Sequence, residues 1–292
     1  MIPPGLLPPR PRDAHKGDAG RVFLLAGSVG LSGAAALCTM GALRVGAGLV
    51  TLGVPKRLHD PMVKKLTEAM LAVLPETTKG SLSLKGLPEI VRLIETMDAV
   101  AIGPGLSRQP QTARLVRELL LRTAKPLVLD ADGLNALAED VTVLKRLLLP
   151  IILTPHPGEM GRLVRLSPAE VQRDRLRIAT EFAKKYRVVV VLKGHETIVA
   201  SYDGAAYVNS TGNPGMASGG CGDVLTGVIA GLLGQRLPLV DAARLGAYLH
   251  GLAGDLAAAE QGEIGLIASD IADRIPRAIR QYQALVVGQC DG

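Results

Sequence analysis

The sequence is poor in aromatic residues and in cysteine. Aromatic residues make up 2% of its 292 residues, and it has no Trp. Its three cysteines, Cys38, Cys221 and Cys290, form no C-x-x-C pair, and so sparse and odd a set argues against a disulfide framework. The core must therefore be built from Leu, Val, Ile and Ala, which suits a buried parallel β-sheet covered by helices.

Signals for export, membranes and nucleic acid are also absent. The N-terminus lacks the charged and apolar regions of a signal peptide, and no apolar run is long enough to span a bilayer. We therefore expect a cytoplasmic protein with no membrane partner. Its net charge of +6 could attract phosphate-bearing ligands or reflect ordinary surface residues. Because no basic stripe is interleaved with aromatics, we expect no nucleic-acid partner.

Four common catalytic or metal-binding motifs are missing. The chain contains no Walker A sequence, which makes a P-loop enzyme a poor candidate. It has neither H-E-x-x-H nor a zinc-type spacing of Cys and His, and no G-x-S-x-G of the α/β-hydrolases. Its chemistry must therefore be sought in less familiar loops.

Aliphatic runs typical of buried strands alternate with helix-like stretches. This alternation predicts βαβ units, a mainly parallel sheet and a single α/β domain with helices on both faces. We predict a Pro-rich irregular arm over residues 1–13 and the domain over residues 14–285. The expected strands are 21–26, 49–52, 70–74, 98–102, 126–130, 150–154, 187–192, 197–200 and 206–208. The expected helices are 33–46, 110–123, 168–185, 222–233, 239–260 and 269–285.

The strongest candidate for chemistry is the glycine-rich turn that leads into the apolar helix 222–233. Its residues Gly219, Gly220, Cys221 and Gly222 can expose successive backbone N–H groups at the positive end of a helix, which makes an anion hole. Asp223 follows directly. It could remove a proton from a hydroxyl that attacks phosphorus, or it could simply cap the helix.

Further polar or glycine-rich loops follow other expected strands. In parallel sheets, ligands sit beyond the carboxyl ends of the strands. The loop at residues 26–35 reads G-x-x-G-x-x-G, which is not a dinucleotide fingerprint, so ligand contact and a tight turn stay equally open. The loop at 103–107 is either a ligand contact or a Pro-Gly turn. Asp130, Asp132 and the amide Asn135 could contact substrate or metal-bound water, or cap the next helix.

Two more loops carry a His or a Lys at a strand end. His156 stands between two prolines in T-P-H-P-G-E, which hold it in a rigid turn beside the other loops. A lone His is usually structural, but substrate contact is the favoured interpretation at this strand end. Lys193 begins K-G-H-E-T. It could reach a nucleotide phosphate or ribose, or be a solvated lysine at a hairpin.

Taken together these loops resemble one family. The G-G-C-G-D turn resembles the anion hole and catalytic Asp of ribokinase-like kinases. The narrower resemblance is to the nucleotide-dependent NAD(P)H-hydrate dehydratases. It rests on H-K-G-D-A-G-R-V, G-P-G-L, L-D-A-D-G-L-N-A-L, T-P-H-P-G-E, L-K-G, N-S-T-G-N-P-G-M-A-S-G-G and Y-L-H-G-L-A-G-D, in this order from about residue 14 to 280. It implies a ribokinase-like three-layer sandwich.

The resemblance also assigns roles to individual residues. It implies that the hydrate contacts Ala34, Gly105, His156 and the catalytic base Asp223. For the nucleotide it implies contacts with Lys193, Gly194, His195, Glu196, Thr197 and Gly222. The sequence departs from the family pattern at Ser32, where Pro is common, at Ser107, where Gly is common, and at Cys221, where Ser is usual.

The activity implied is ADP-dependent dehydration of the S form of NAD(P)H hydrate, with Mg²⁺ as cofactor. Bacterial-type members use ADP and release AMP, whereas eukaryotic members use ATP, so ATP is the alternative. The resemblance implies a homotetramer. It also implies an NAD(P)H-hydrate epimerase, either a separate protein or a removed segment, because many bacterial members carry one as an N-terminal domain. Metal ligands cannot be assigned from the sequence.

Two other functions fit the same anion turn. A small-molecule kinase of this fold would leave the phosphate on an alcohol, and a non-catalytic nucleotide-binding module would not need Asp223 as a base.

Overall fold

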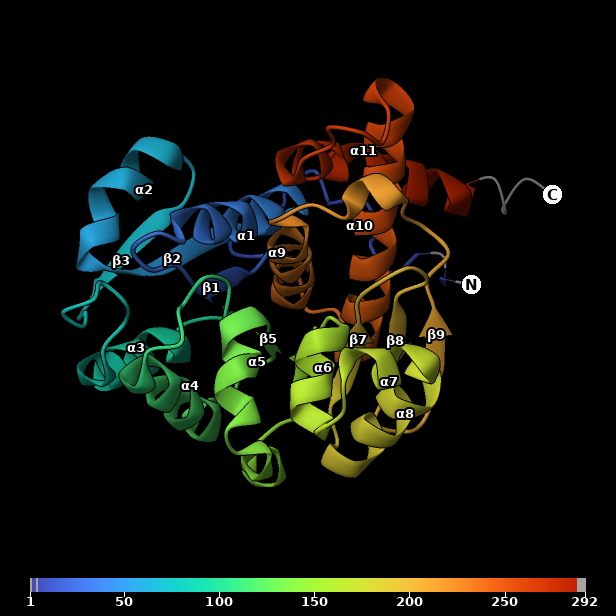
Figure 1. Ribbon diagram of the computed structural model, residues 1–292. Helices are drawn as coiled ribbons and strands as arrows, with labels where there is room; N and C mark the ends of the chain where they lie inside the picture. The colour runs from blue at the N-terminus through green and yellow to red at the C-terminus, as the bar shows by residue number, and fades with distance from the viewer. Residues whose placement is uncertain (1, 4, 288–292) are drawn as a thin grey trace.

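A nine-stranded sheet forms the centre of the molecule in a computed structural model that describes residues 2–3 and 5–287 (Figure 1). The strand order is β3-β2-β1-β4-β5-β6-β7-β8-β9. Strands β1 to β7 run parallel, and β8 and β9 add an antiparallel edge. The strands are Arg21–Leu25 (β1), Leu49–Pro55 (β2), Met70–Leu74 (β3), Ala99–Ile102 (β4), Leu127–Leu129 (β5), Ile152–Leu153 (β6), Val189–Leu192 (β7), Ile198–Ala200 (β8) and Ala206–Val208 (β9).

Helices cover both faces of this sheet, so the three layers are as expected (Figure 1). On one face lie α1 (Ser32–Arg44), α9 (Cys221–Gly234), α10 (Leu239–Gln261) and α11 (Ala268–Val287). On the other lie α3 (Leu87–Glu95), α4 (Pro110–Arg122), α5 (Ala131–Ala138), α6 (Pro157–Val164), α7 (Pro168–Arg173) and α8 (Arg175–Tyr186). The helix α2 (His59–Lys65) packs beside β3, and short 3₁₀ turns η1 to η4 occupy Lys56–Leu58, Leu84–Gly86, Val141–Arg146 and Pro214–Met216.

Strand β1 shows how the sequence makes two hydrophobic cores. Its side chains alternate between the faces of the sheet, since the repeat of a strand is two residues. Val22 and Leu24 enter the core under α1 and α9, whereas Phe23 and Leu25 enter the core under α3 to α8. A continuous aliphatic run is therefore what a strand covered on both faces requires.

Close packing of α1 on α9 fixes the start of α9. A Cβ added to Gly41 would lie 2.3 Å from the carbonyl oxygen of Val224, and one added to Gly227 would lie 1.9 Å from that of Cys38. The small-residue character of α1 thus lets two helix backbones touch. Any larger side chain at these positions would push the two helices apart.

The predicted strands are confirmed, most of them with ends shifted by one or two residues. The helix expected over 168–185 was wrong in one respect, because it breaks at Asp174 into α7 and α8. The sequence reasoning missed α2, α3, α5 and α6, which are all shorter than ten residues. Ahead of Arg21 the described residues form no helix or strand; Met1 and Pro4 of the predicted arm lie outside them. None of the helices in the described part of the chain is long and apolar enough to cross a membrane.

Candidate functional site

Five loops follow the carboxyl ends of parallel strands at one edge of the sheet. They follow β1, β4, β5, β6 and β7. The strand order reverses between β1 and β4, where β1 pairs with both β2 and β4, and a crevice for ligands forms at such a point. Each of these loops follows a strand as expected from the sequence, and parallel pairing of the strands brings the loops to the same end of the sheet.

The glycine turn forms the N-terminus of α9 beside this edge. Gly220 precedes the helix with φ of +95°, a backbone conformation that glycine adopts without strain. A Cβ here would lie 2.4 Å from Cδ1 of Leu37 on α1. No side chain caps the helix start, so the N–H groups of its first turn stay available to an anion.

Asp223 is the third residue of α9. The N-cap position belongs to Gly220, so the capping alternative for Asp223 is excluded. Burial raises the pKa of the Asp223 carboxyl to about 7, with the charge of Asp130 adding to the rise and that of Lys193 opposing it. A carboxylate with a pKa near neutral pH suits a general base.

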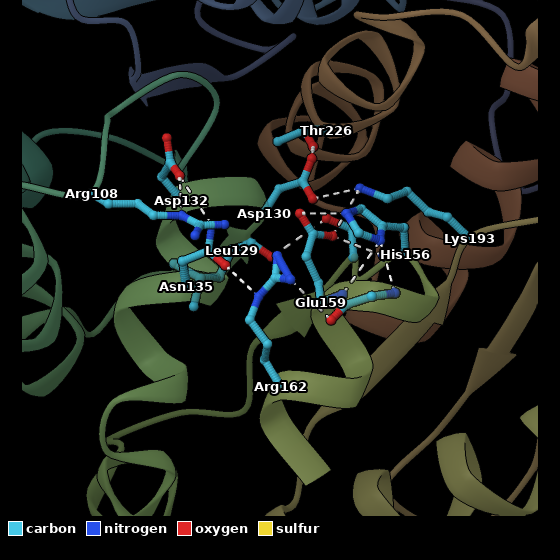
Figure 2. A network of polar contacts seen from close by, with 12 residues as sticks. Arg108, Leu129, Asp130, Asp132, Asn135, His156, Glu159, Arg162, Lys193 and Thr226 are labelled. Carbon is cyan, nitrogen blue, oxygen red and sulfur yellow. Dashed lines mark hydrogen bonds and ion pairs between the residues drawn. The ribbon is translucent and has the colours of Figure 1, made fainter. Parts of the chain in front are cut away.

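The buried Asp130 ties the start of α9 to the end of β7 (Figure 2). It is 1% exposed. Its Oδ1 lies 2.7 Å from Nζ of Lys193, and its Oδ2 accepts a hydrogen bond of 2.6 Å from Oγ1 of Thr226 on α9. A Cβ on Gly222 would lie 3.2 Å from the same Nζ. Burial alone would lower the pKa of Lys193, but Asp130 and Glu159 raise it overall, so the ammonium stays charged.

His156 both caps a helix and faces this network. Its Nδ1 accepts hydrogen bonds from the N–H groups of Gly158 and Glu159 at the start of α6, which leaves the proton on Nε2. Burial lowers its pKa, so the ring is neutral near pH 7. Nε2 lies 3.4 Å from Glu159 Oε1, and Glu159 Oε2 lies 3.7 Å from Lys193 Nζ. His156 therefore reaches the Lys193 cluster through a buried carboxylate (Figure 2).

Asp132 holds the loop that follows β4. Its Oδ2 accepts a 2.8 Å hydrogen bond from the N–H of Ser107, and its Oδ1 accepts one of 3.0 Å from Asn135. Arg162 in turn donates to Asn135 at 2.9 Å (Figure 2). Ser107 has φ of +71°, in the region that favours glycine, so this hydrogen bond helps hold a strained residue.

Ala34 and Gly105 come together as expected. A Cβ on Gly105 would lie 3.0 Å from that of Ala34, and φ at Gly105 is +63°. The two loops are also joined by Ser28, whose hydroxyl donates to the carbonyl of Gly105 at 2.8 Å. Any side chain at Gly105 would close the space between α1 and the loop after β4.

A pocket of about 420 Å³ lies beside the start of α9. All six residues assigned to the nucleotide line it: Lys193, Gly194, His195, Glu196, Thr197 and Gly222. Cys221 also lines it. A second pocket of about 440 Å³ lies among η3, α6 and α8 and contains none of the predicted site residues.

Three residues of this region, Glu159, Thr226 and His250, have no role assigned from the sequence. Glu159 and Thr226 join the Asp130 network, and Asn135 supports Asp132. His250 lines the 420 Å³ pocket, where burial lowers its pKa to about 4. Its neutral ring therefore donates from Nε2 to the carbonyl of Cys221 at 2.9 Å. All but Thr226 lie in the quoted motifs, but their partners are 3 to 96 residues away in sequence.

The carboxylate oxygens near Asp223 are of the kind that coordinates a hard cation. Asp130, Glu159 and Asp132 supply carboxylate oxygens, and their charges act on Asp223. Within the described residues no cluster of three or more His, Cys, Asp or Glu could hold a metal by itself. This set fits Mg²⁺ that is bound mainly by phosphate oxygens and water, with one or two protein carboxylates.

The fold and the site together define a class of protein. A mainly parallel sheet, a glycine turn at the N-terminus of a central helix and an acid in its first turn place the chain in the ribokinase-like superfamily. A family model described as NAD(P)H-hydrate dehydratase matches residues 22–277. The chain belongs to this family.

Individual relatives and a solved structure agree with that assignment. The bifunctional NAD(P)H-hydrate repair enzyme Nnr of Moorella thermoacetica is 50% identical over 277 residues, 95% of this chain but 52% of that protein. The ADP-dependent (S)-NAD(P)H-hydrate dehydratase of Bacillus subtilis is 37% identical over 95% of both. A crystal structure of the Bacillus subtilis ADP/ATP-dependent NAD(P)H-hydrate dehydratase, co-crystallised with ATP and Mg²⁺, matches with a TM-score of 0.81 and 35% identity over 94% of each chain. The chain thus spans about half the length of several curated relatives.

Proposed function

We propose that this chain dehydrates the S form of NAD(P)H hydrate to NAD(P)H, with ADP as phosphoryl donor and ATP as the alternative donor. The observation that carries the proposal is the position of Asp223. The preceding residue, Gly222, lines the 420 Å³ pocket. Gly220, three residues before Asp223, lies against Leu37 on α1, the helix that also bears Ala34. These contacts support a base that acts between a nucleotide in this pocket and a hydrate at the loop pair of Ala34 and Gly105.

The proposed reaction begins with deprotonation. Asp223 takes the proton of the ring hydroxyl of the hydrate, and the oxygen attacks the terminal phosphorus of ADP. The bond to AMP breaks, and AMP departs. Phosphate then leaves the ring carbon with the bonding electron pair, assisted by the lone pair of the ring nitrogen. Loss of a proton from the neighbouring ring carbon restores the double bond of NAD(P)H.

The N-terminus of α9 supplies the anion hole for this transfer. The backbone N–H groups at Gly219 to Gly222 would face the phosphoryl oxygens, where charge develops. Lys193, held beside Gly222 by Asp130, would add a positive charge on the nucleotide side. Mg²⁺, when bound with the nucleotide near Asp223 or its acidic neighbours, neutralises phosphate charge. His156 would contact the hydrate through its exposed half, since its side chain is 50% exposed.

The test is direct. Purified protein is incubated with NADH hydrate, Mg²⁺ and either ADP or ATP, and the return of NADH absorbance is followed together with phosphate and AMP. We expect NADH and phosphate in equal amounts. A stable phosphorylated alcohol without NADH would instead indicate the small-molecule kinase. Nucleotide binding without any turnover would indicate the binding module.

Three further expectations concern the setting of the reaction. The bifunctional names of several relatives support an epimerase that works with this activity, on another domain or a separate protein. A homotetramer and a cytoplasmic location remain predictions. Size-exclusion chromatography with light scattering tests the tetramer.

A further inference from the structure

The nucleotide pocket is braced from behind by Arg175, the first residue of α8. Its Nη2 donates a hydrogen bond of 3.0 Å to the carbonyl of Leu192, and its Nη1 donates to the carbonyl of His195. These carbonyls flank Lys193 and Gly194. One guanidinium therefore spans the bend at which β7 ends and the loop over residues 193–197 begins.

Arg175 also fits the unusual backbone of this loop. Gly194 has φ of +143°, and a Cβ there would lie 3.1 Å from Nη2 of Arg175. The glycine thus leaves room for the guanidinium to approach the chain. Arg175 does not line the 420 Å³ pocket, whereas all five residues of the loop do. Any effect of Arg175 on a ligand must therefore pass through the loop.

Two other hydrogen bonds act on this loop. The N–H of Lys193 donates to the carbonyl of Pro155 at 2.8 Å, and Thr197 closes the far end by donating to the carbonyl of Gly194 at 3.0 Å. These bonds hold the two ends of the loop. Arg175 joins the end of β7 to the carbonyl of His195 between them, and a planar guanidinium with donors in fixed directions is suited to two acceptors at once.

We infer that Arg175 is a positioning residue. It sets the shape of the 193–197 loop, which binds the nucleotide, and does not touch the ligand itself. The inference rests on the proposed function for the identity of the ligand as ADP or ATP. The inference predicts different effects on the affinities for nucleotide and for hydrate. The two carbonyls to which Arg175 donates belong to Leu192 and His195 and not to the hydrate loops at Ala34 and Gly105.

The experiment compares Arg175→Met and Arg175→Lys with wild type. Calorimetric binding of MgADP is measured without hydrate, and the KM values for ADP and for hydrate are measured separately. We expect Arg175→Met to weaken MgADP binding and raise KM for ADP by about tenfold, since two charge-assisted hydrogen bonds are lost. KM for hydrate should stay within about twofold. Arg175→Lys should recover part of the loss, because an ammonium keeps the charge and can donate to either carbonyl.

Arg177 provides a matched control on the same helix. It is exposed and pairs with Asp174 and Glu181, so Arg177→Met should bind MgADP as wild type does. The inference is overturned if both Arg175 variants bind MgADP normally, or if the two KM values rise together in step with a loss of thermal stability. If Arg175→Met does not fold, the KM split of Arg175→Lys decides. Failure of wild type to dehydrate the hydrate would refute the proposed function, while MgADP binding would still test the role of Arg175.

Discussion

Replacing Asp223 by Asn should slow turnover strongly and at the same time stabilise the protein. The pKa of this carboxyl rises from its ordinary value of 3.8 to about 7, chiefly because it is buried. The folded state therefore holds a proton that the unfolded state has already released between about pH 4 and pH 7, and stability falls as pH rises through that window. A rise of about three pH units, at about 1.4 kcal/mol each, lowers the free energy of unfolding of wild type above pH 7 by about 4 kcal/mol. Asn carries no charge and avoids this cost.

The assay is thermal unfolding of both proteins from pH 5 to pH 8. For a chain of this size, about 4 kcal/mol corresponds to a Tm difference of roughly 8 °C in favour of Asp223→Asn at pH 8. The difference should shrink by about 1.4 kcal/mol for each pH unit below 7. Turnover of the same variant should fall about 10²–10⁴-fold, as expected for loss of a general base.

The control is Glu68→Gln, which removes an exposed carboxylate on the turn before β3. Its Tm should follow that of wild type at every pH, because exposed charges contribute little to stability. A Tm gap for Asp223→Asn that does not vary between pH 5 and pH 8 would refute the assigned pKa. An Asn variant less stable than wild type at pH 8 would refute the claim that the ionised carboxylate is costly.

Other perturbations test the remaining parts of the site. Lys193→Met removes a charge that lowers the pKa of Asp223, so the acid limb of the kcat–pH profile should move to higher pH and KM for ADP should rise. Asp132→Ala frees the loop after β4 and should raise KM for hydrate about tenfold, because the hydrogen bond to Ser107 lies on the hydrate side. Gly227→Ala would place a Cβ 1.9 Å from a backbone oxygen of α1 and should cost more than about 2 kcal/mol by urea unfolding. Gly33→Ala, where a Cβ meets nothing within 4 Å, is its control.

The sequence predicted the sheet and the edge at which the loops meet, because both follow from local patterns. An aliphatic run such as 187–192 indicates a strand buried on both faces, and the ends of parallel strands share one edge. The sequence could not distinguish a structural role from a binding role of one residue. His156 was weighed as substrate contact against a structural role, and its Nδ1 caps α6 while half of the side chain remains exposed. For Lys193, the solvated alternative was wrong, since the side chain is 18% exposed and paired with Asp130.

The features that could not be predicted from the sequence depend on contacts between distant segments. Thr226 and Asp130 are 96 residues apart, and nothing in the local pattern of either predicts that one hydroxyl joins them. Arg175 begins a helix that was expected to be continuous from 168 to 185; the break at Asp174 places it at a helix start, from which it reaches the loop after β7. A helix boundary is weakly specified by sequence, yet here it decides which side chain supports the nucleotide loop.

The same charges that position Lys193 also set the strength of the base. Asp130 holds the ammonium beside the start of α9, and the negative charge of Asp130 raises the pKa of Asp223 while the ammonium lowers it. If the phosphates of a nucleotide pair with Lys193, its ammonium lowers the pKa of Asp223 less. The negative charge of the phosphates raises the pKa of Asp223 further. Mg²⁺ acts in the opposite direction, because it brings positive charge with the nucleotide. The acid limb of the kcat profile should therefore lie at higher pH when Mg²⁺ is scarce, and an unchanged limb would show that Asp223 does not sense the phosphates.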